Sequence, residues 1–547
     1  MLRRLLFLPV FVMVITSCQS DKISVDLIVQ NAVIYTADSA FSIHAAMAVK
    51  EGKILEVGDN LLINNKYETD SVLDVKGKAI YPGFIDAHCH FYGLALNSRY
   101  ADLSGATSFG QVLDILTKQQ EQKPSDWISG RGWDQNKWPG HQFPDNKKLN
   151  DLFPETPVVL VRVDGHAVLV NDAAIALSGI TIDSIVNKKE AFIERGKFTG
   201  IFLESLADRF RNLIPEPTIQ ELTELVNISA NQCYSVGLTM VADAGLDAGI
   251  IDFYDNLQSD GQLQMAIYAM LNPNEENFKR FLRKGIYVRP KLSVRSLKLY
   301  ADGALGSRGA CLLRPYSDSP GEHGILTITP EDLGRYCVMA YDNGYQVNTH
   351  AIGDSAVRTV LRVYSDYLLP GNNLRWRVEH AQVVHPDDFK LFGEFAIVPS
   401  VQATHATSDM GWARSRLGDS RIRNAYAYKT LMQQNGWIPN GTDFPIENIS
   451  PLLTFYASVS RKDLKGKPAT GFQKENALTR QEALRSITKW AAKSCFEENR
   501  RGSIEPGMNA DFVVIDRDIM QVPEKEIPKA KVIMTVIDGK AVYTSTK

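Results

Sequence analysis

The sequence predicts an α/β protein, a (β/α)8 TIM barrel with a β-sandwich split between the N-terminal and C-terminal segments. Three observations predict this fold: β-rich stretches at both ends, short apolar runs separated by helical patterns, and polar residues where those runs end. The chain has 547 residues, 44% of them hydrophobic, and can therefore bury a large core. Barrels of this class commonly exceed the usual domain size.

The chain begins with a basic and apolar leader. Two arginines precede an apolar segment at residues 5–15, which is too short to span a bilayer comfortably. The next residues, ITSC, end at Cys18 and resemble a bacterial lipobox, in which the cysteine is lipidated. We expect residues 1–18 to be a signal peptide, and the mature protein to be an exported periplasmic or cell-surface lipoprotein anchored to the membrane at Cys18. An uncleaved anchor is the alternative.

Both ends of the remaining chain carry β-hairpin patterns. Near the start, DLIVQNAVIYTAD and MAVKEGKILEVGD alternate apolar and polar residues around a Glu51-Gly52 turn. Near the end, ADFVVIDRD and KVIMTVIDGKAVY follow the same pattern, and Asp538-Gly539 suits a two-residue hairpin loop. One sandwich built from residues 19–80 and 496–547 is predicted.

Residues 81–495 are predicted to form the barrel. Short apolar runs alternate there with helical patterns such as residues 354–368. The runs lie at residues 83–90, 237–243, 263–271, 292–303, 345–354, 375–382, 396–402 and 436–445. Eight parallel strands with intervening helices predict a barrel whose chemistry gathers at the C-terminal ends of the strands.

The segment from about residue 94 to 217 interrupts this alternation. It contains a helical pattern near residues 109–122 and possible strands in WISGRGWD and PVVLVRVDGHAVLV. Insertions after a barrel strand lie above the active-site mouth. We therefore expect this insertion to shape or cover the pocket.

Charge and cysteine content limit the possible partners. Acidic and basic residues are interspersed, and the formal net charge is -3, so nothing suggests a nucleic-acid surface. A small-molecule substrate is the expected ligand. The cysteines after Cys18 are scattered without CxxC spacing, which excludes a disulfide framework or a zinc knuckle.

Residues that can bind a metal end several of the predicted strands. They are His88, His90, Lys298, His350, His380 and Asp443. In a strand, His88 and His90 share one face, and the ends of parallel barrel strands meet at one mouth. Imidazole and carboxylate are the usual donors for zinc and similar divalent ions. A divalent metal site, with zinc as the expected ion, is therefore predicted.

Structural roles are the alternatives for each of these residues. The histidines could be hydrogen-bonded core residues, Lys298 a solvated salt-bridge partner, and Asp443 the cap of a turn. Their common position at strand ends favours the metal site.

The order of these residues resembles the amidohydrolase superfamily, the urease-like metal-dependent hydrolases, over nearly the whole mature chain. The resemblance rests on HxH in GFIDAHCH, the lysine in LKLYADGALGSR, the histidines in NTHAIGD and RVEHAQ, and the aspartate in NGTDFP. The stretch RGSIEPGMNADFVVID is similar to the family's return to its β-sandwich. More narrowly, RGWDQ, DGHAVLVN and ADGALGSR resemble the branch that contains N-substituted formamide deformylases.

The resemblance implies a centre of one or two metal ions. The HxH pair and Asp443 would hold one ion, His350 and His380 the second, and a carbamate formed from Lys298 and carbon dioxide would bridge them. A metal-bound hydroxide would attack the substrate, with Asp443 as general base and then general acid. The expected reaction is hydrolysis of a non-peptide C–N bond, in an amide or formamide.

Other residues are predicted to bind substrate. Trp133, Asp134 and His166 lie in the insertion, and Arg308 lies in GALGSRGA. Packing or loop contacts would explain each of them equally well. Two other functions also stay open: a lactone or ester hydrolase or an isomerase that uses the same site, and a noncatalytic binding lipoprotein.

Overall fold

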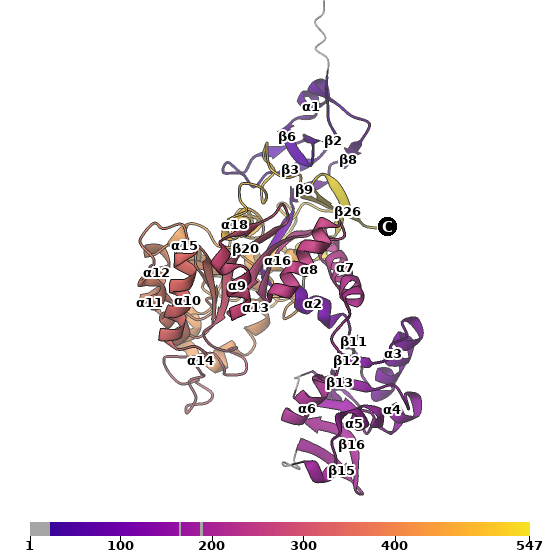
Figure 1. Ribbon diagram of the computed structural model, residues 1–547. Helices are drawn as coiled ribbons and strands as arrows, with labels where there is room; N and C mark the ends of the chain where they lie inside the picture. Colours follow the sequence, from indigo (N-terminus) through magenta and orange to yellow (C-terminus); the bar gives the residue numbers. More distant parts are fainter. Residues whose placement is uncertain (1–21, 164–165, 186–189, 547) are drawn as a thin grey trace, which may run out of the picture.

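The computed structural model describes residues 22–163, 166–185 and 190–546. Its central sheet is parallel and follows the order β10-β17-β18-β20-β21-β22-β23. These strands are β10 (Phe84–Cys89), β17 (Leu238–Leu246), β18 (Ala266–Leu271), β20 (Leu292–Tyr300), β21 (Gln346–Ala351), β22 (Arg377–His380) and β23 (Val398–Ser400). Each coincides with one of the predicted runs, so the predicted TIM barrel is confirmed (Figure 1).

The eighth position of the barrel is filled by an irregular segment and not by a regular strand. Asn440 forms an isolated parallel bridge with Val401, and the Asp443 amide donates to the His88 carbonyl at 2.8 Å. The segment therefore closes the sheet between β23 and β10. Prolines 439 and 445 remove two amide donors from this segment, which prevents a longer ladder.

Gly441 allows this segment to lie directly on β10. A Cβ atom at Gly441 would lie 2.5 Å from the His88 nitrogen and 2.7 Å from Asp86 Oδ1. Any larger residue would push the segment away from the strand. The close approach places Asp443 beside His88.

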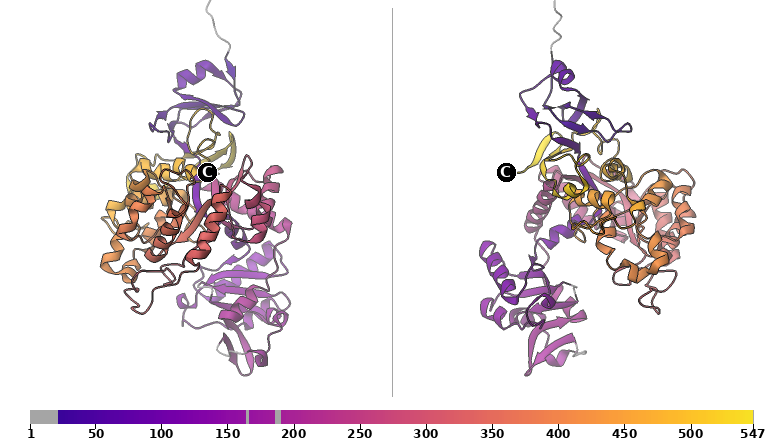
Figure 2. Two further views of the ribbon diagram at one scale, coloured as in Figure 1. Left: turned by 60° about the vertical axis from the view of Figure 1, so that its left-hand side comes forward. Right: turned by 180° about the vertical axis from the view of Figure 1, so that it is seen from behind.

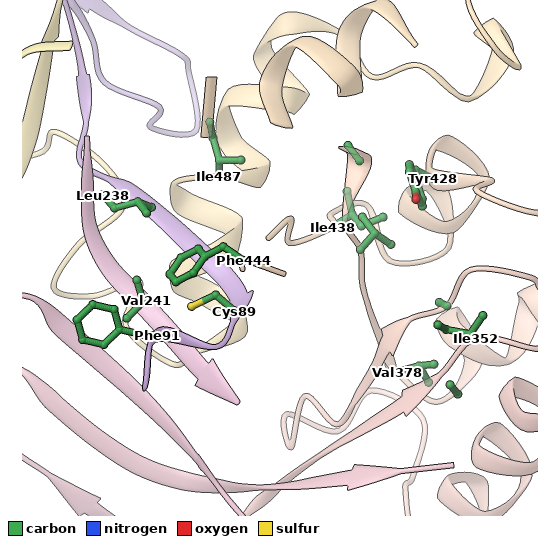
Figure 3. Close-up of a cluster of buried hydrophobic side chains, with 14 of the residues drawn as sticks. Cys89, Phe91, Leu238, Val241, Ile352, Val378, Tyr428, Ile438, Phe444 and Ile487 are labelled. Atoms are coloured by element: carbon green, nitrogen blue, oxygen red, sulfur yellow. The ribbon is translucent and has the colours of Figure 1, made fainter. Parts of the chain in front are cut away.

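Helices cover the outside of the barrel. They include α7 (Ile219–Ser235), α8 (Ala248–Ser259), α10 (Pro330–Asp342), α11 (Asp354–Ser365) and α16 (Pro451–Ser460). In α11, Val357, Val360, Leu361 and Tyr364 are buried, and their spacing places them on one helical face. Figure 3 shows part of the core between these helices and the sheet, where Cys89 of β10 packs near Phe91 and Val241.

The insertion forms a lobe with its own sheet. The sheet follows the order β11-β12-β13-β14-β16-β15. Its strands are β11 (Ala101–Asp102), β12 (Ile128–Trp133), β13 (Val158–Arg162), β14 (Ala167–Val170), β15 (Ala191–Glu194) and β16 (Lys197–Leu203), and its helices include α3 (Phe109–Gln122), α4 (Lys147–Leu152), α5 (Asp172–Ser178) and α6 (Glu204–Arg211). The lobe projects from the barrel, and the β-sandwich lies at the other end of the molecule (Figures 1 and 2).

The β-sandwich is assembled from both ends of the chain. One sheet follows the order β6-β5-β2-β8 and the other β26-β25-β24-β9-β3-β4. In the second sheet, β24 (Phe512–Ile515) pairs antiparallel with β9 (Ala79–Pro82), which joins segments more than four hundred residues apart. The remaining strands are β2 (Leu27–Gln30), β3 (Val33–Tyr35), β4 (Ile43–His44), β5 (Ala46–Lys50), β6 (Lys53–Gly58), β8 (Val72–Asp74), β25 (Val532–Ile537) and β26 (Lys540–Thr544).

Candidate metal centre

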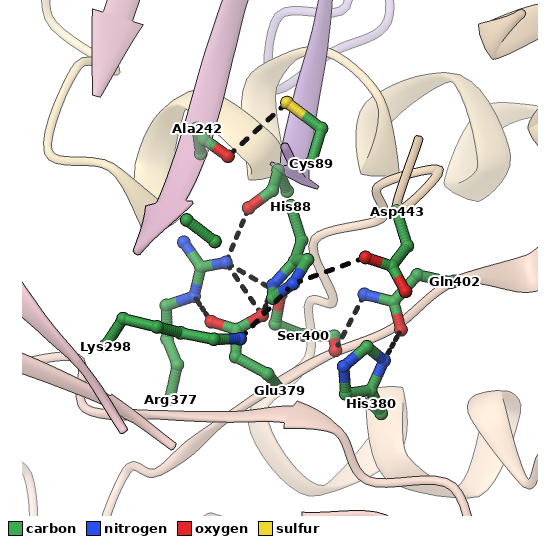
Figure 4. A network of polar contacts seen from close by, with 12 residues as sticks. His88, Cys89, Ala242, Lys298, Arg377, Glu379, His380, Ser400, Gln402 and Asp443 are labelled. Carbon is green, nitrogen blue, oxygen red and sulfur yellow. Dashed lines mark hydrogen bonds and ion pairs between the residues drawn. The ribbon is translucent and has the colours of Figure 1, made fainter. Parts of the chain in front are cut away.

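The structure brings together the predicted metal-binding side chains at the mouth of the barrel. His88 and His90 lie at the end of β10, Lys298 on β20, His350 on β21, His380 on β22 and Asp443 on the closing segment. Figure 4 shows His88 surrounded by Lys298, Glu379 and Asp443. The His88 ring centroid lies 5.0 Å from that of His380, which in turn lies 4.6 Å from that of His350.

His88 and His90 converge on one oxygen of Asp443. Asp443 Oδ1 lies 3.3 Å from His90 Nε2 and 3.6 Å from His88 Nε2. The other nitrogen of His90, Nδ1, lies 3.1 Å from the Ala244 carbonyl and therefore serves as the donor. The lone pair of His90 Nε2 is then directed toward Asp443, as a metal ligand requires.

A buried ion pair orients His88 from behind. Its Nδ1 lies 2.6 Å from Glu379 Oε2, and Arg377 donates to the same carboxylate. Burial alone would raise the pKa of Glu379, but Arg377 and His88 outweigh it and hold that pKa below its usual range. The ionised Glu379 accepts the His88 Nδ1 proton and leaves the Nε2 lone pair for a metal.

Lys298 lies beside the ring nitrogen of His88 that faces Asp443. Its Nζ is 3.3 Å from His88 Nε2, and its side chain is fully buried. Burial lowers the pKa of Lys298 to about 8, although the carboxylates of Glu379 and Asp443 counteract this effect. A larger share of this lysine is therefore a neutral amine than of an exposed lysine.

His350 and His380 form the other side of the cluster. Gln402 Oε1 lies 2.7 Å from His380 Nδ1, which leaves His380 Nε2 for a ligand. Burial lowers the pKa of His350 to about 3, and nearby Lys298 adds to the effect, so the ring is neutral at pH 7. Neutral imidazole is the form that binds a metal.

Asp443 is held in an unusual backbone conformation. Its φ is +63° and that of His380 is +73°, both in the left-handed region that non-glycine residues rarely adopt. Such conformations cost about 1–2 kcal/mol each. Neighbouring Thr442 fixes the segment through Asp86, whose carboxylate accepts the Thr442 amide and hydroxyl protons. These contacts hold Asp443 at the cluster.

The sequence interpretation missed His405, which lies on α13 (Ala403–Asp409) directly after β23. His405 Nε2 lies 3.7 Å from Asp443 Oδ2, and its ring stacks on His380 with centroids 5.8 Å apart. The signal that could have identified it is its position three residues after the predicted run at 396–402. Glu379, between Val378 and His380, was missed as well.

The donor atoms fit a divalent metal. Ligand atoms of His88, His90 and Asp443 lie within 4.8 Å of one another, as do those of His380, His405 and Asp443. Asp443 Oδ1 and the Nε2 atoms of His350 and His405 are buried without a hydrogen-bond partner among the described residues. Unpaired buried lone pairs are costly, and a cation would satisfy them. The site therefore has the composition and the unpaired atoms of a metal centre.

The residues predicted to bind substrate lie away from this cluster. Trp133 is buried in the lobe, where its Nε1 donates to the Leu160 carbonyl at 2.9 Å. Asp134 pairs with Arg162 at 3.1 Å, also within the lobe. The structure does not bring either residue to the metal centre, because the lobe uses them for its own packing.

His166 and Arg308 are likewise engaged elsewhere. His166 Nδ1 lies 3.1 Å from Glu204 Oε2, and both side chains are exposed. Arg308 donates to both carboxylate oxygens of Asp318 at 3.2 Å, within the loop between β20 and α10. Their substrate-binding roles remain predictions.

Comparison with known proteins supports the interpretation of the site. The model of the Amidohydrolase family matches residues 71–543. The N-substituted formamide deformylase of Arthrobacter pascens is 25% identical, over 95% of this chain and 99% of that protein. The protein LONG AFTER FAR-RED 3 of Arabidopsis thaliana is 29% identical, over 95% of this chain and 91% of that protein.

A solved structure has the same architecture. An uncharacterized metal-dependent hydrolase from Pyrococcus horikoshii OT3 superposes with a TM-score of 0.77 and 28% sequence identity, over 91% of this chain and 99% of that chain. The family match, the barrel and the cluster of metal-binding side chains agree with one another. The chain belongs to the amidohydrolase family and is a metal-dependent hydrolase.

Proposed function

We propose that this protein hydrolyses a non-peptide C–N bond, in an amide or formamide, with a divalent metal as cofactor. The observation that carries the proposal is the convergence of His88 and His90 on Asp443, with Lys298 in contact with His88. The similarity to an N-substituted formamide deformylase supports the choice of bond.

The side chains divide into two groups that could each hold an ion. His88, His90 and Asp443 would bind one ion, and His350 with His380 would bind a second. A bound ion would polarise the substrate carbonyl and lower the pKa of water, and zinc suits these nitrogen and oxygen donors. Lys298 would join the two groups as a carbamate, because a free ammonium has no lone pair for a metal.

Asp443 is the residue we propose to move the proton. Burial would raise its pKa, but His90 and the other histidines around the carboxylate keep the pKa below its usual range, so Asp443 is ionised at pH 7. Asp443 would take a proton from the attacking water and deliver it to the nitrogen of the leaving amine. The water oxygen would bond to the acyl carbon first, and the C–N bond would break when the nitrogen receives the proton, which releases the neutral amine.

The first experiment combines metal analysis with a substrate panel. The full chain is purified without chelators and its metal content is measured by mass spectrometry. About one to two ions per chain are expected, and chelation should abolish turnover until metal is restored. The panel contains an N-substituted formamide, an N-acyl amino acid and a lactone.

Each outcome has a distinct meaning. Turnover of the formamide or the N-acyl amino acid supports the proposal, whereas turnover of the lactone alone would replace it by an ester hydrolase. A chain that binds no metal and cleaves none of the three would refute it.

The carbamate can be tested separately. Intact-protein mass spectrometry under non-denaturing conditions should show one added carbon dioxide on the wild type and none on Lys298→Ala. Acetate or propionate should restore part of the activity of Lys298→Ala, because a small carboxylate can occupy the space of the carbamate. No added mass and no rescue would remove the carbamate from the proposal.

We also propose export and lipid anchoring at Cys18. Residues 1–21 lie outside the described part of the chain, so the leader and the lipobox rest on the sequence. In the described ranges no helix has the length and hydropathy to cross a bilayer. Labelling with radioactive palmitate should mark the wild type and leave Cys18→Ala unlabelled.

A further inference from the structure

We propose that the substrate carries a carboxylate, and that Arg131 of the insertion lobe binds this group in a cavity beside the metal centre. This inference rests on the proposed function and specifies its substrate class. The cavity has a volume of about 460 Å³. Its lining includes His90, Tyr92, Leu246, Pro445, Ile446 and Arg131.

The position of the cavity connects it to the chemistry. His90 belongs both to the cavity wall and to the candidate metal centre, where its Nε2 lies 3.3 Å from Asp443 Oδ1. Its side chain is 30% exposed, whereas that of His88 is fully buried. A ligand in the cavity would therefore approach the centre from the His90 side.

Arg131 gives the lining of the cavity its positive charge. Arg131 is the only lysine or arginine among the described residues that line it. In β12 the residues around Arg131 are buried, and Arg131 alone is exposed. Within the described ranges, no hydrogen bond or ion pair engages its guanidinium. A planar guanidinium with free donors suits bidentate binding of a carboxylate.

The acidic residue in the same lining does not neutralise Arg131. Asp243 is buried, and its carboxylate accepts the amide protons of Phe91 and Tyr92 and the hydroxyl of Tyr254. These contacts occupy Asp243 within the barrel wall. The Arg131 charge is therefore available to a ligand.

The other residues that line the cavity indicate which kind of ligand it suits. Tyr92, Leu246, Pro445 and Ile446 provide apolar surface in the same cavity as His90 and Arg131. Such a cavity favours a ligand with an apolar body and a single anionic group. An N-acyl amino acid with an apolar side chain has this chemistry, with its acyl group toward the metal centre and its carboxylate toward Arg131.

A pair of matched substrates tests the inference. N-formylphenylalanine and N-formylphenethylamine differ only in the carboxylate. Arg131→Gln should raise KM for N-formylphenylalanine at least about tenfold and leave KM for N-formylphenethylamine within about twofold. The control variant is Lys148→Gln, an exposed lobe cation outside the cavity, which should change neither value. Equal changes for both substrates in Arg131→Gln would overturn the inference.

A binding measurement separates this inference from the proposed function. Calorimetry of the full chain with 3-phenylpropanoate, which cannot be hydrolysed, should show binding to the wild type and loss of at least about tenfold in affinity in Arg131→Gln. If this loss occurs but the chain binds no metal and cleaves none of the panel substrates, the anion site stands and the proposed function falls. If both formamides are cleaved and 3-phenylpropanoate binds equally to both proteins, the proposed function stands and the anion site falls.

Discussion

The barrel mouth and the insertion lobe bury their charged side chains to different extents. At the mouth, Glu379, Arg377 and Lys298 are almost completely buried and face one another around His88. In the lobe, His166 and Glu204 form a pair in which both side chains are exposed. The lobe interior is instead apolar, with Trp133 and Trp138 packed in its core.

This difference indicates that the barrel mouth carries the chemistry and that the lobe contributes to substrate recognition. Burying charges is costly unless they are paired or bind a metal, so a cluster of buried charges indicates a site that the fold maintains for a reason. The lobe carries no comparable cluster among its described residues. The lobe is expected to contribute through Arg131, which lines the cavity beside His90.

The strongest test of this division is Asp443→Asn. The substitution preserves shape but removes the proton acceptor, so kcat/KM should fall by about 10²–10⁴-fold. Steady-state kinetics measure the loss, and circular dichroism checks that the fold is retained. Asp151→Asn, at an exposed position of the lobe, serves as the matched control and should retain wild-type activity. Normal turnover in Asp443→Asn would remove Asp443 from the chemistry.

The second test concerns the support behind His88. Glu379→Gln leaves the buried Arg377 guanidinium without its counter-charge and should lower the free energy of unfolding by about 3–5 kcal/mol. The affinity for the metal should fall about 10–100-fold, because His88 loses its orienting acceptor. Urea unfolding and competition with a chelator measure the two effects.

The control for this test is an exposed ion pair. Glu224 lies 3.1 Å from Lys123, and both side chains are about half exposed. Glu224→Gln should change the free energy of unfolding by less than about 1 kcal/mol. If Glu379→Gln proved as mild as this control, the buried pair would not support the metal centre.

The smallest expected effect comes from Trp133→Phe. Phenylalanine keeps an aromatic ring but leaves the Leu160 carbonyl without its indole donor, which should cost about 1–3 kcal/mol in the lobe. Hydrogen exchange should increase within residues 101–211 and stay unchanged in the barrel, with kcat altered less than about twofold. A loss of turnover as large as that in Asp443→Asn would instead support a substrate contact for Trp133.

The sequence was most informative where regular geometry relates position to function. Strands of a barrel end at one mouth, so His88, His350 and His380 could be placed together from their positions in the apolar runs alone. The closing segment was predicted as a strand, but its prolines and the close approach of Gly441 to β10 limit it to an isolated bridge. Local pattern does not report such long-range contacts.

Residues outside the strand ends were harder to predict. His405 reaches Asp443 from a helix after β23, and no periodicity indicates how that helix is oriented. The tryptophans of the insertion suit an aromatic wall as well as a core, and only the packing of Trp133 on Trp138 distinguishes the two. Composition alone cannot tell which way a side chain faces in an irregular insertion.

The self-contained core of the lobe has an evolutionary consequence. Its buried clusters consist of residues from the insertion and are separate from those of the barrel. Mutations that remodel this module can therefore accumulate without repacking the catalytic scaffold. Divergence among descendants of such an enzyme would concentrate in the lobe and change which molecules are accepted while the bond-breaking apparatus is inherited intact.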